Sequence, residues 1–232
     1  MIMEYFRNPV QLEQESLLHA MQRAVQYAGG LVLDIGCGSK PYEKFFSDRT
    51  QAYIGTDIDL SNAKKVDVCA DSLQLPFRSS SFDTVVSNQA IEHVQHPEVF
   101  VAEASRVLKA GGTLIITSPQ LWCLHEKPHD YYRFTRYALE LLCAKNELDV
   151  LLLEERYGAF AAIGQMAALM VYLPNSGNKL RTHVARLAFG PAQLVGKLLD
   201  RLFYNPDLTL GYILVARKRG GGNATKESRS SR

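Results

Sequence analysis

Short runs of apolar and β-branched residues alternate with polar or helical stretches along the chain. Seven such runs predict strands, at 31–35, 52–56, 66–69, 82–87, 113–117, 148–153 and 210–215. Strands that alternate with helices are typical of an α/β fold with a mostly parallel sheet, and we expect the last two strands to form an antiparallel pair. The pattern therefore predicts a doubly wound, mostly parallel seven-stranded sheet.

Three stretches show helical spacing of apolar residues. Residues 11–28 predict an amphipathic helix before the first strand. A second helix is expected to begin at Pro97, which suits a first helical turn, and to stop at Gly111-Gly112, so that Thr113 opens the next strand. A long helical insertion at about 159–203 precedes the last strand, and we expect it to form a lid over a substrate pocket.

The charge is distributed unevenly between the body of the chain and its end. Residues 218–232 hold five basic residues and one acid, so residues 1–217 carry about −2 of the total net charge of +2. We therefore expect one domain over residues 1–217 and a disordered basic tail over 218–232. A nucleic-acid-binding domain usually gathers its Lys and Arg on one face of the fold, so no nucleic-acid partner is predicted.

The sequence gives no sign of export. Its first residues lack a basic segment followed by an apolar run, and its four cysteines form no Cys-x-x-Cys pair. A cytoplasmic location is predicted. The helical insertion sets Phe160, Met166 and Leu169 near basic residues such as Lys179 and Arg186, so peripheral contact with the inner face of a membrane stays open as the alternative to a lid.

The segment Leu31–Tyr42 contains the strongest chemical signal, an apolar strand that ends in Asp34 and then turns through Gly36 and Gly38. Glycines let a backbone approach a ligand closely, and the following helix start offers free N–H groups. Dinucleotide enzymes place a third glycine where this chain has Pro41, which disfavours a nicotinamide reductase. Nineteen residues after Gly38, Asp57 follows the second strand, where a carboxylate suits ribose hydroxyls.

Three further segments, at 69–77, 81–94 and 108–114, complete a pattern that resembles the class I S-adenosylmethionine-dependent methyltransferases of the type 11, or ubiquinone/menaquinone-methyltransferase-like, group. The resemblance implies a Rossmann-like fold and S-adenosylmethionine as cofactor. It assigns Asp34, Gly36 and Gly38 to the methionine part, Asp57 to the ribose, Asp71, Ser72 and Leu73 to the adenine, and Asn88 and Gln89 to the closing of the site, and Cys37 and Ile58 complete the predicted cofactor-binding set. Lys40 replaces the third glycine of the commoner pattern, which leaves the local geometry of the turn open.

Candidate acceptor-side residues lie in two places. His93, just beyond the fourth strand, is a candidate general base for a hydroxyl acceptor. The segment His125–Thr135 follows the fifth strand, where open α/β sheets place substrate loops, and His129, Tyr131 and Arg133 offer a base, a stacking surface and an anion clamp. Both histidines and Arg133 are predicted catalytic residues. The spacing of His125 and His129 alone predicts no metal site.

The identity of the acceptor rests on resemblance alone. The segment His129–Thr135 is similar to one in bacterial methyltransferases of surface-polysaccharide or glycolipid biosynthesis, which implies O-methylation of a small-molecule, glycan or lipid-linked acceptor. A quinone or other lipid acceptor remains an alternative. So does a non-catalytic module that only binds S-adenosylmethionine.

Overall fold

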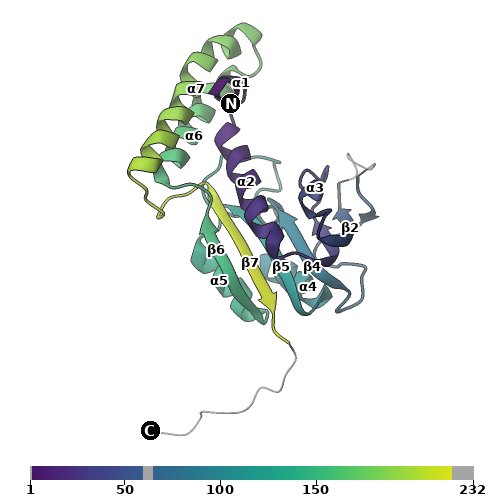
Figure 1. Ribbon diagram of the computed structural model, residues 1–232. Coiled ribbons are helices and arrows are strands. Elements are labelled where there is room, and N and C mark those ends of the chain that lie inside the picture. The colour runs from purple at the N-terminus through teal and green to yellow at the C-terminus, as the bar shows by residue number, and fades with distance from the viewer. Residues whose placement is uncertain (1, 60–64, 221–232) are drawn as a thin grey trace, which may run out of the picture.

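The computed structural model describes residues 2–59 and 65–220 (Figure 1). Its helices are α1 (Ile2–Arg7), α2 (Gln11–Ala24), η1 (Val25–Tyr27), α3 (Glu43–Phe46), η3 (Ile91–His93), α4 (Pro97–Val107), α5 (Arg136–Lys145), α6 (Ala159–Tyr172), η4 (Leu173–Asn175) and α7 (Lys179–Leu202). Its strands are β1 (Gly30–Ile35), β2 (Thr50–Asp57), β3 (Val68–Cys69), β4 (Phe82–Asn88), β5 (Leu108–Pro119), β6 (Leu148–Glu155) and β7 (Gly211–Lys218). The part of the predicted tail at 221–232 lies outside the described residues.

The seven strands form one sheet in the order β3-β2-β1-β4-β5-β7-β6. The ladders from β3 to β5 are parallel, whereas β7 runs antiparallel to both of its neighbours. The predicted fold class and the antiparallel last pair are therefore confirmed. One boundary was wrong: α4 ends at Val107 and β5 begins at Leu108, so Gly111-Gly112 lies within the strand rather than ending the helix.

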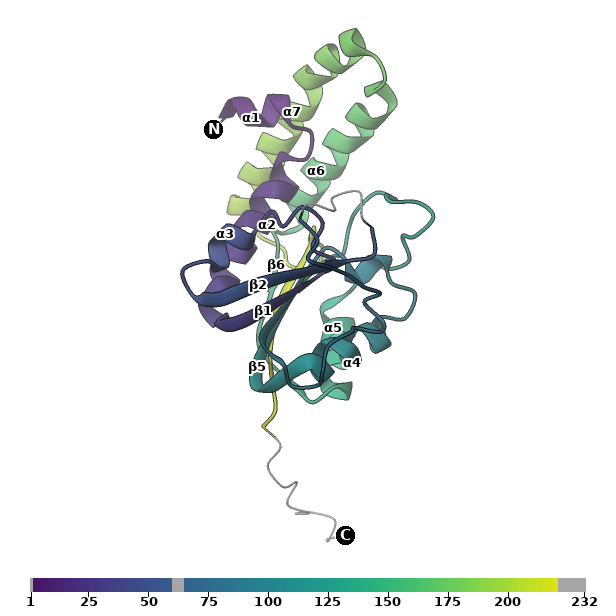
Figure 2. The same cartoon turned by 90° about the vertical axis from the view of Figure 1, so that its right-hand side faces the viewer.

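Helices cover both faces of the sheet, as the two views show (Figures 1 and 2). On one face α4 and α5 pack Phe100, Val101 and Leu139 against the strands. On the other face α2 and α3 contribute Met21 and Phe46 to a second apolar cluster. The carboxyl ends of the parallel strands stay open between these layers, and open α/β sheets bind ligands at that edge.

The insertion before β7 forms an antiparallel hairpin of α6 and α7 that projects from the sheet (Figure 1). The two helices cross backbone against backbone, because a Cβ added at Gly164 would lie 2.6 Å from the carbonyl oxygen of Ala192, and one at Gly196 only 2.7 Å from that of Phe160. Asp200, near the end of α7, accepts a 2.9 Å hydrogen bond from the N–H of Gly158. That carboxylate caps the start of α6, where no neighbouring side chain does.

Buried glutamines join the hairpin to the rest of the molecule. The Oε1 atom of Gln193 accepts a hydrogen bond from the N–H of Leu12, and that of Gln165 accepts one from the N–H of Glu13. These amides satisfy donors in the first turn of α2, which needs partners because helix starts leave their N–H groups unpaired. The hairpin thereby caps a helix more than 150 residues away in sequence. Among residues 2–59 and 65–220, no helix combines the length and apolar content needed to cross a bilayer.

Candidate active site

Two adjoining cavities open at the carboxyl ends of the parallel strands. The smaller, of about 220 Å³, is lined by residues that include Asp34, Cys37 and Asn88. The larger, of about 700 Å³, shares Gly36 and Gly38 with it and extends past the end of β2. Each of the eleven residues predicted to bind the cofactor lines one cavity or the other. The structure thus brings together residues spread from position 34 to position 89.

The glycine turn after β1 takes a backbone shape that favours glycine. Gly36 and Gly38 have φ angles of 71° and 49°, and a Cβ at Gly36 would lie 2.6 Å from the Cβ of Ala90. Around Gly38 no protein atom lies within 4 Å of such a Cβ. The N–H of Gly38 donates a 2.9 Å hydrogen bond to Oδ2 of Asp57, which links the turn to the end of β2.

Lys40 stands where the commoner pattern has its third glycine, and its contacts show how the turn forms without that glycine. Its φ angle of 53° lies in the left-handed region, where a non-glycine residue costs roughly 1–2 kcal/mol. The side chain is buried, and its ammonium forms an ion pair with Asp67, whose carboxylate also accepts the N–H of Gly55 at 2.7 Å. This pair offsets the backbone strain and holds the turn against β2.

Asp34 is a buried carboxyl beneath the smaller cavity. Burial raises the pKa of Asp34 to about 7, while a 2.7 Å hydrogen bond from the Tyr53 hydroxyl and the nearby charge of Lys40 oppose that rise. A buried carboxylate that lacks a full counter-charge is suited to receive a cationic group. The ammonium of a bound methionine moiety would be such a group. Tyr53 was not predicted, because its place in β2 indicates only a strand residue.

The far end of the larger cavity is lined by Ile58, Asp71, Ser72 and Leu73. Asp71 turns the chain there, because its Oδ1 accepts the N–H of Leu73 at 2.8 Å. Asn88 and Gln89 lie at the end of β4. Thr117 donates a 2.7 Å hydrogen bond to Oδ1 of Asn88, and Gln89 has a φ angle of 50°.

The lining of the larger cavity also includes His93, Glu126, His129 and Tyr131. The ring Nδ1 of His93 lies 2.7 Å from the carbonyl oxygen of His129, and Nδ1 of His129 lies 3.0 Å from the Tyr131 hydroxyl. The loop after β5 therefore meets η3 at this wall. Both predicted histidines are placed beside the predicted cofactor residues.

Arg133 has a different place from the one expected. Its guanidinium binds both carboxylate oxygens of Asp130, at 2.6 and 2.8 Å, and donates to the carbonyl of Cys123 at 3.1 Å. Arg133 also holds the pKa of Asp130 well below its usual range. It lines neither cavity. These donors serve the protein's own loop in this structure, and the role of Arg133 as an anion clamp for substrate stays a prediction.

Asp83 is an acid that lines neither cavity. Its carboxylate pairs with Lys109 at 2.8 Å and accepts the N–H of Leu31 at 2.9 Å, at the base of the sheet.

The cysteines differ in their exposure to solvent. Cys37 and Cys143 are buried, whereas Cys69 is exposed.

A sheet of this order, with a glycine turn after β1 and an acid after β2, defines an α/β protein that binds a nucleoside-containing cofactor. Residues 33–116 match the protein family described as a methyltransferase domain. A Mycolicibacterium smegmatis protein named "Probable S-adenosylmethionine-dependent methyltransferase" is 34% identical over 100 residues, which cover 40% of this chain and 39% of that protein. The matched segment and the order of the strands thus give this chain a methyltransferase domain with the class I fold.

The names of other relatives refer to different substrates. The mouse "Probable tRNA methyltransferase 9B" is 36% identical over 110 residues, which cover 44% of this chain and 24% of that protein. A mitochondrial 2-methoxy-6-polyprenyl-1,4-benzoquinol methylase of Caenorhabditis elegans is 41% identical over 58 residues, or 25% of this chain and 20% of its own length. The matches cover about a quarter to a half of the first relatives.

The fold likeness extends over more of the chain. A methyltransferase solved in complex with the Haloferax volcanii Trm112 activator superposes with a TM-score of 0.58 at 19% identity, over 93% of this chain and 95% of that one. At this identity the likeness shows the fold alone. It confirms the Rossmann-like class I methyltransferase architecture that the sequence predicted.

Proposed function

We propose that this chain transfers the methyl group of S-adenosylmethionine to a hydroxyl of a small-molecule, glycan or lipid-linked acceptor. One observation carries the proposal: all eleven predicted cofactor residues line a pair of joined cavities whose remaining wall bears His93, His129 and Tyr131. That wall argues against a module that only binds the cofactor, because such a module would need no polar acceptor side.

The sulfonium methyl is already activated, so the protein mainly has to hold the acceptor oxygen about 3 to 3.5 Å from the methyl carbon, in line with the sulfur. The oxygen then forms a bond to carbon while the carbon–sulfur bond breaks and leaves its electron pair on sulfur, giving S-adenosylhomocysteine. The hydroxyl proton passes to a base. His129 is the better candidate for that base, because the remaining ring nitrogen of His93, Nε2, faces the carboxylates of Glu92 and Glu126 at 3.9 and 3.6 Å.

A lipid-linked or quinone acceptor is favoured by one face of the hairpin. Helix α7 exposes an apolar stripe at i, i+4 and i+7 spacing, formed by Leu180, Val184, Leu187, Val195, Leu198 and Leu202. Exposed Lys179, Arg181 and Arg201 lie on the same helix. An apolar stripe beside basic residues suits the surface of an anionic membrane. None of residues 159–203 lines either cavity, so the lid role of the hairpin stays a prediction.

The cofactor half of the proposal is tested by calorimetric titration of the purified chain with S-adenosylmethionine, S-adenosylhomocysteine and NADH. Micromolar binding of the first two without NADH is expected. Binding of NADH instead would favour a nicotinamide reductase and refute the proposal. Labelled S-adenosylmethionine is then offered with glycan, glycolipid, quinone and tRNA fractions. The tRNA arm is included because of the mouse relative's name, although residues 1–217 carry a net negative charge.

A further inference from the structure

Glu92 is a carboxyl enclosed in the protein with no hydrogen-bond partner in any other described residue. Its side chain has no exposed surface, and only its own backbone N–H is placed to donate to the carboxylate. Of the nearby guanidinium groups, Arg133 binds Asp130, and Arg156 binds Glu13 through Nη1 while its Nε and Nη2 donate to no described group. Buried polar groups are rarely left unpaired, and an ion is one of the partners that completes such groups.

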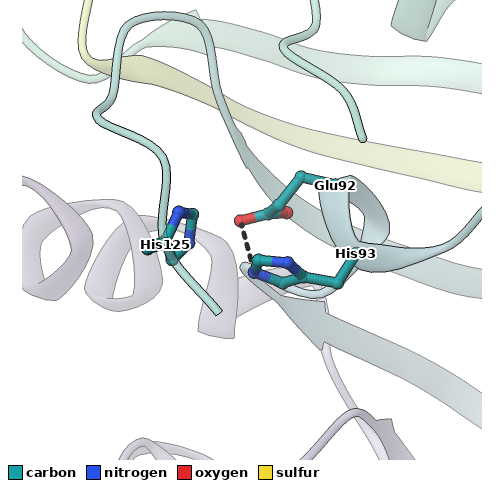
Figure 3. A group of neighbouring side chains, drawn as sticks. All are labelled: Glu92, His93 and His125. Carbon is teal, nitrogen blue, oxygen red and sulfur yellow. Dashed lines mark ion pairs between the residues drawn. The ribbon is translucent and has the colours of Figure 1, made fainter. Parts of the chain in front are cut away.

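Two histidines face this carboxylate (Figure 3). The Nε2 of His93 lies 3.9 Å from Oε1 of Glu92, and the set of Glu92, His93 and His125 offers three ligand atoms that all lie within 4.8 Å of one another. Glu92 and His93 come from η3, whereas His125 comes from the loop after β5. Residues from two separate segments thus converge on one point.

The second nitrogen of each ring has a partner of the kind found at metal sites. Nδ1 of His93 lies 2.7 Å from the carbonyl oxygen of His129, and Nδ1 of His125 lies 3.2 Å from that of Cys123. A carbonyl only accepts, so each ring nitrogen there must carry the hydrogen, which leaves the lone pair on Nε2. Histidines that bind metals usually donate their other N–H to a carbonyl or carboxylate.

We propose that Glu92, His93 and His125 bind one divalent transition-metal ion of the zinc type. Two imidazoles and a carboxylate are a known zinc donor set, with bonds of about 2.0–2.2 Å. Tetrahedral bonds of that length place ligand atoms about 3.4 Å apart, so the 3.9 Å between Glu92 and His93 needs only a small side-chain rotation. Glu126, with Oε2 3.6 Å from Nε2 of His93, is placed to add a fourth ligand.

The position of this site gives the ion a role in methyl transfer. That role rests on the proposed function, whereas the binding of the metal does not. His93 and Glu126 both line the larger cavity, which several of the predicted cofactor residues also line. An ion held there is placed to bind an oxygen of the acceptor and to make its hydroxyl more acidic. The acceptor class this favours is one with a hydroxyl that can act as a metal ligand.

The full chain, stripped with EDTA and dialysed, is titrated with Co²⁺ and followed by its visible absorption bands, with Zn²⁺ as competitor. We expect one equivalent to bind, and His125→Ala to weaken binding by at least about 100-fold. His96→Ala is the matched control, because His96 is an exposed histidine that faces Glu98 at 3.4 Å. No Co²⁺ bands at one equivalent, or equal binding by His125→Ala, would overturn the proposal.

Glu92→Gln separates metal binding from folding. In EDTA this variant is expected to unfold at the same temperature as the parent or higher, because the amide replaces a buried carboxyl that no other described residue hydrogen-bonds. Zn²⁺ should raise the unfolding temperature of the parent and not that of Glu92→Gln. An equal rise in both contradicts the site. S-adenosylhomocysteine titrated into the same samples reports on the cofactor cavity alone, so loss of that binding with intact Co²⁺ bands refutes the proposed function and leaves the metal site standing.

Discussion

Asp57 ties the glycine turn to the second strand, because its Oδ2 accepts a 2.9 Å hydrogen bond from the N–H of Gly38. Its Oδ1 accepts a second hydrogen bond, also 2.9 Å long, from the N–H of Asp59. The carboxylate is therefore fixed at the wall of the larger cavity, which it lines. One side chain both shapes the turn and faces the predicted ribose position.

We expect Asp57→Ala to weaken the affinity for S-adenosylhomocysteine by more than about tenfold, because hydrogen bonds to a charged group are worth about 1.5–3 kcal/mol. Calorimetry measures this affinity. Asp149→Ala is the control, since Asp149 is an exposed acid that pairs with Arg219 far along the sheet. Unchanged affinity in a folded Asp57→Ala protein would contradict the ribose assignment.

The raised pKa of Asp34 predicts that cofactor binding depends on pH. Only the ionised carboxylate attracts the ammonium of the methionine moiety, and Asp34, with a pKa of about 7, loses that charge as the pH falls. The affinity for S-adenosylhomocysteine should therefore be about tenfold lower at pH 6 than at pH 8, in proportion to the ionised fraction. Asp34→Asn should bind weakly and show no such change. A flat profile in the parent protein would remove Asp34 from the methionine site.

Replacing His129 should affect methyl transfer, whereas replacing Arg133 should affect the stability of the fold. His129→Ala is expected to lower labelled methyl transfer into the acceptor fraction by about 10²–10⁴-fold, the range for a lost general base, and to leave the affinity for S-adenosylhomocysteine within twofold. Arg133→Ala leaves the carboxylate of Asp130, which is only 2% exposed, without its main partner. It should reduce stability by about 1–3 kcal/mol in urea unfolding. A stable Arg133→Ala protein that has lost only transfer would restore Arg133 to the acceptor side.

The apolar stripe on α7 predicts binding to anionic vesicles. Leu187 is 74% exposed, and burying a leucine side chain is worth about 1.5–3 kcal/mol, so Leu187→Asp should lower co-sedimentation with phosphatidylglycerol vesicles by about tenfold or more. Leu141→Asp is the matched control, because Leu141 is an exposed leucine of α5, away from the hairpin. Equal losses in both variants, or no vesicle binding by the parent, would speak against membrane contact.

Much of the fold could be predicted because local sequence patterns determine its strands and helices. Periodicity located all seven strands, because it depends on neighbours in sequence, and the family resemblance selected residues that line the two cavities. The boundary at Leu108 was missed because Gly111-Gly112 looks like a helix stop, whereas the glycines lie in the twisted start of β5. Gly111 there has a φ angle of 76°.

What could not be predicted depends on contacts between distant segments. The guanidinium of Arg133 has the chemistry of an anion clamp, and only the fold shows that it is bound to the carboxylate of Asp130. Glu92 lies in a segment whose sequence drew attention to His93 alone, yet burial gives the carboxylate its chemistry. The caps of α2 come from Gln165 and Gln193, which no local pattern of helix starts would indicate.

The backbone crossing at Gly164 and Gly196 has a mechanical consequence. Because the backbones meet directly at this crossing, we expect α6 and α7 to move as one stiff arm, which the cap from Asp200 closes at its base. A force applied at the outer end of the arm is therefore transmitted through Gln165 and Gln193 to the first turn of α2. From there the buried pair of Glu13 and Arg156 carries it to the end of β6, the strand at the antiparallel edge of the sheet.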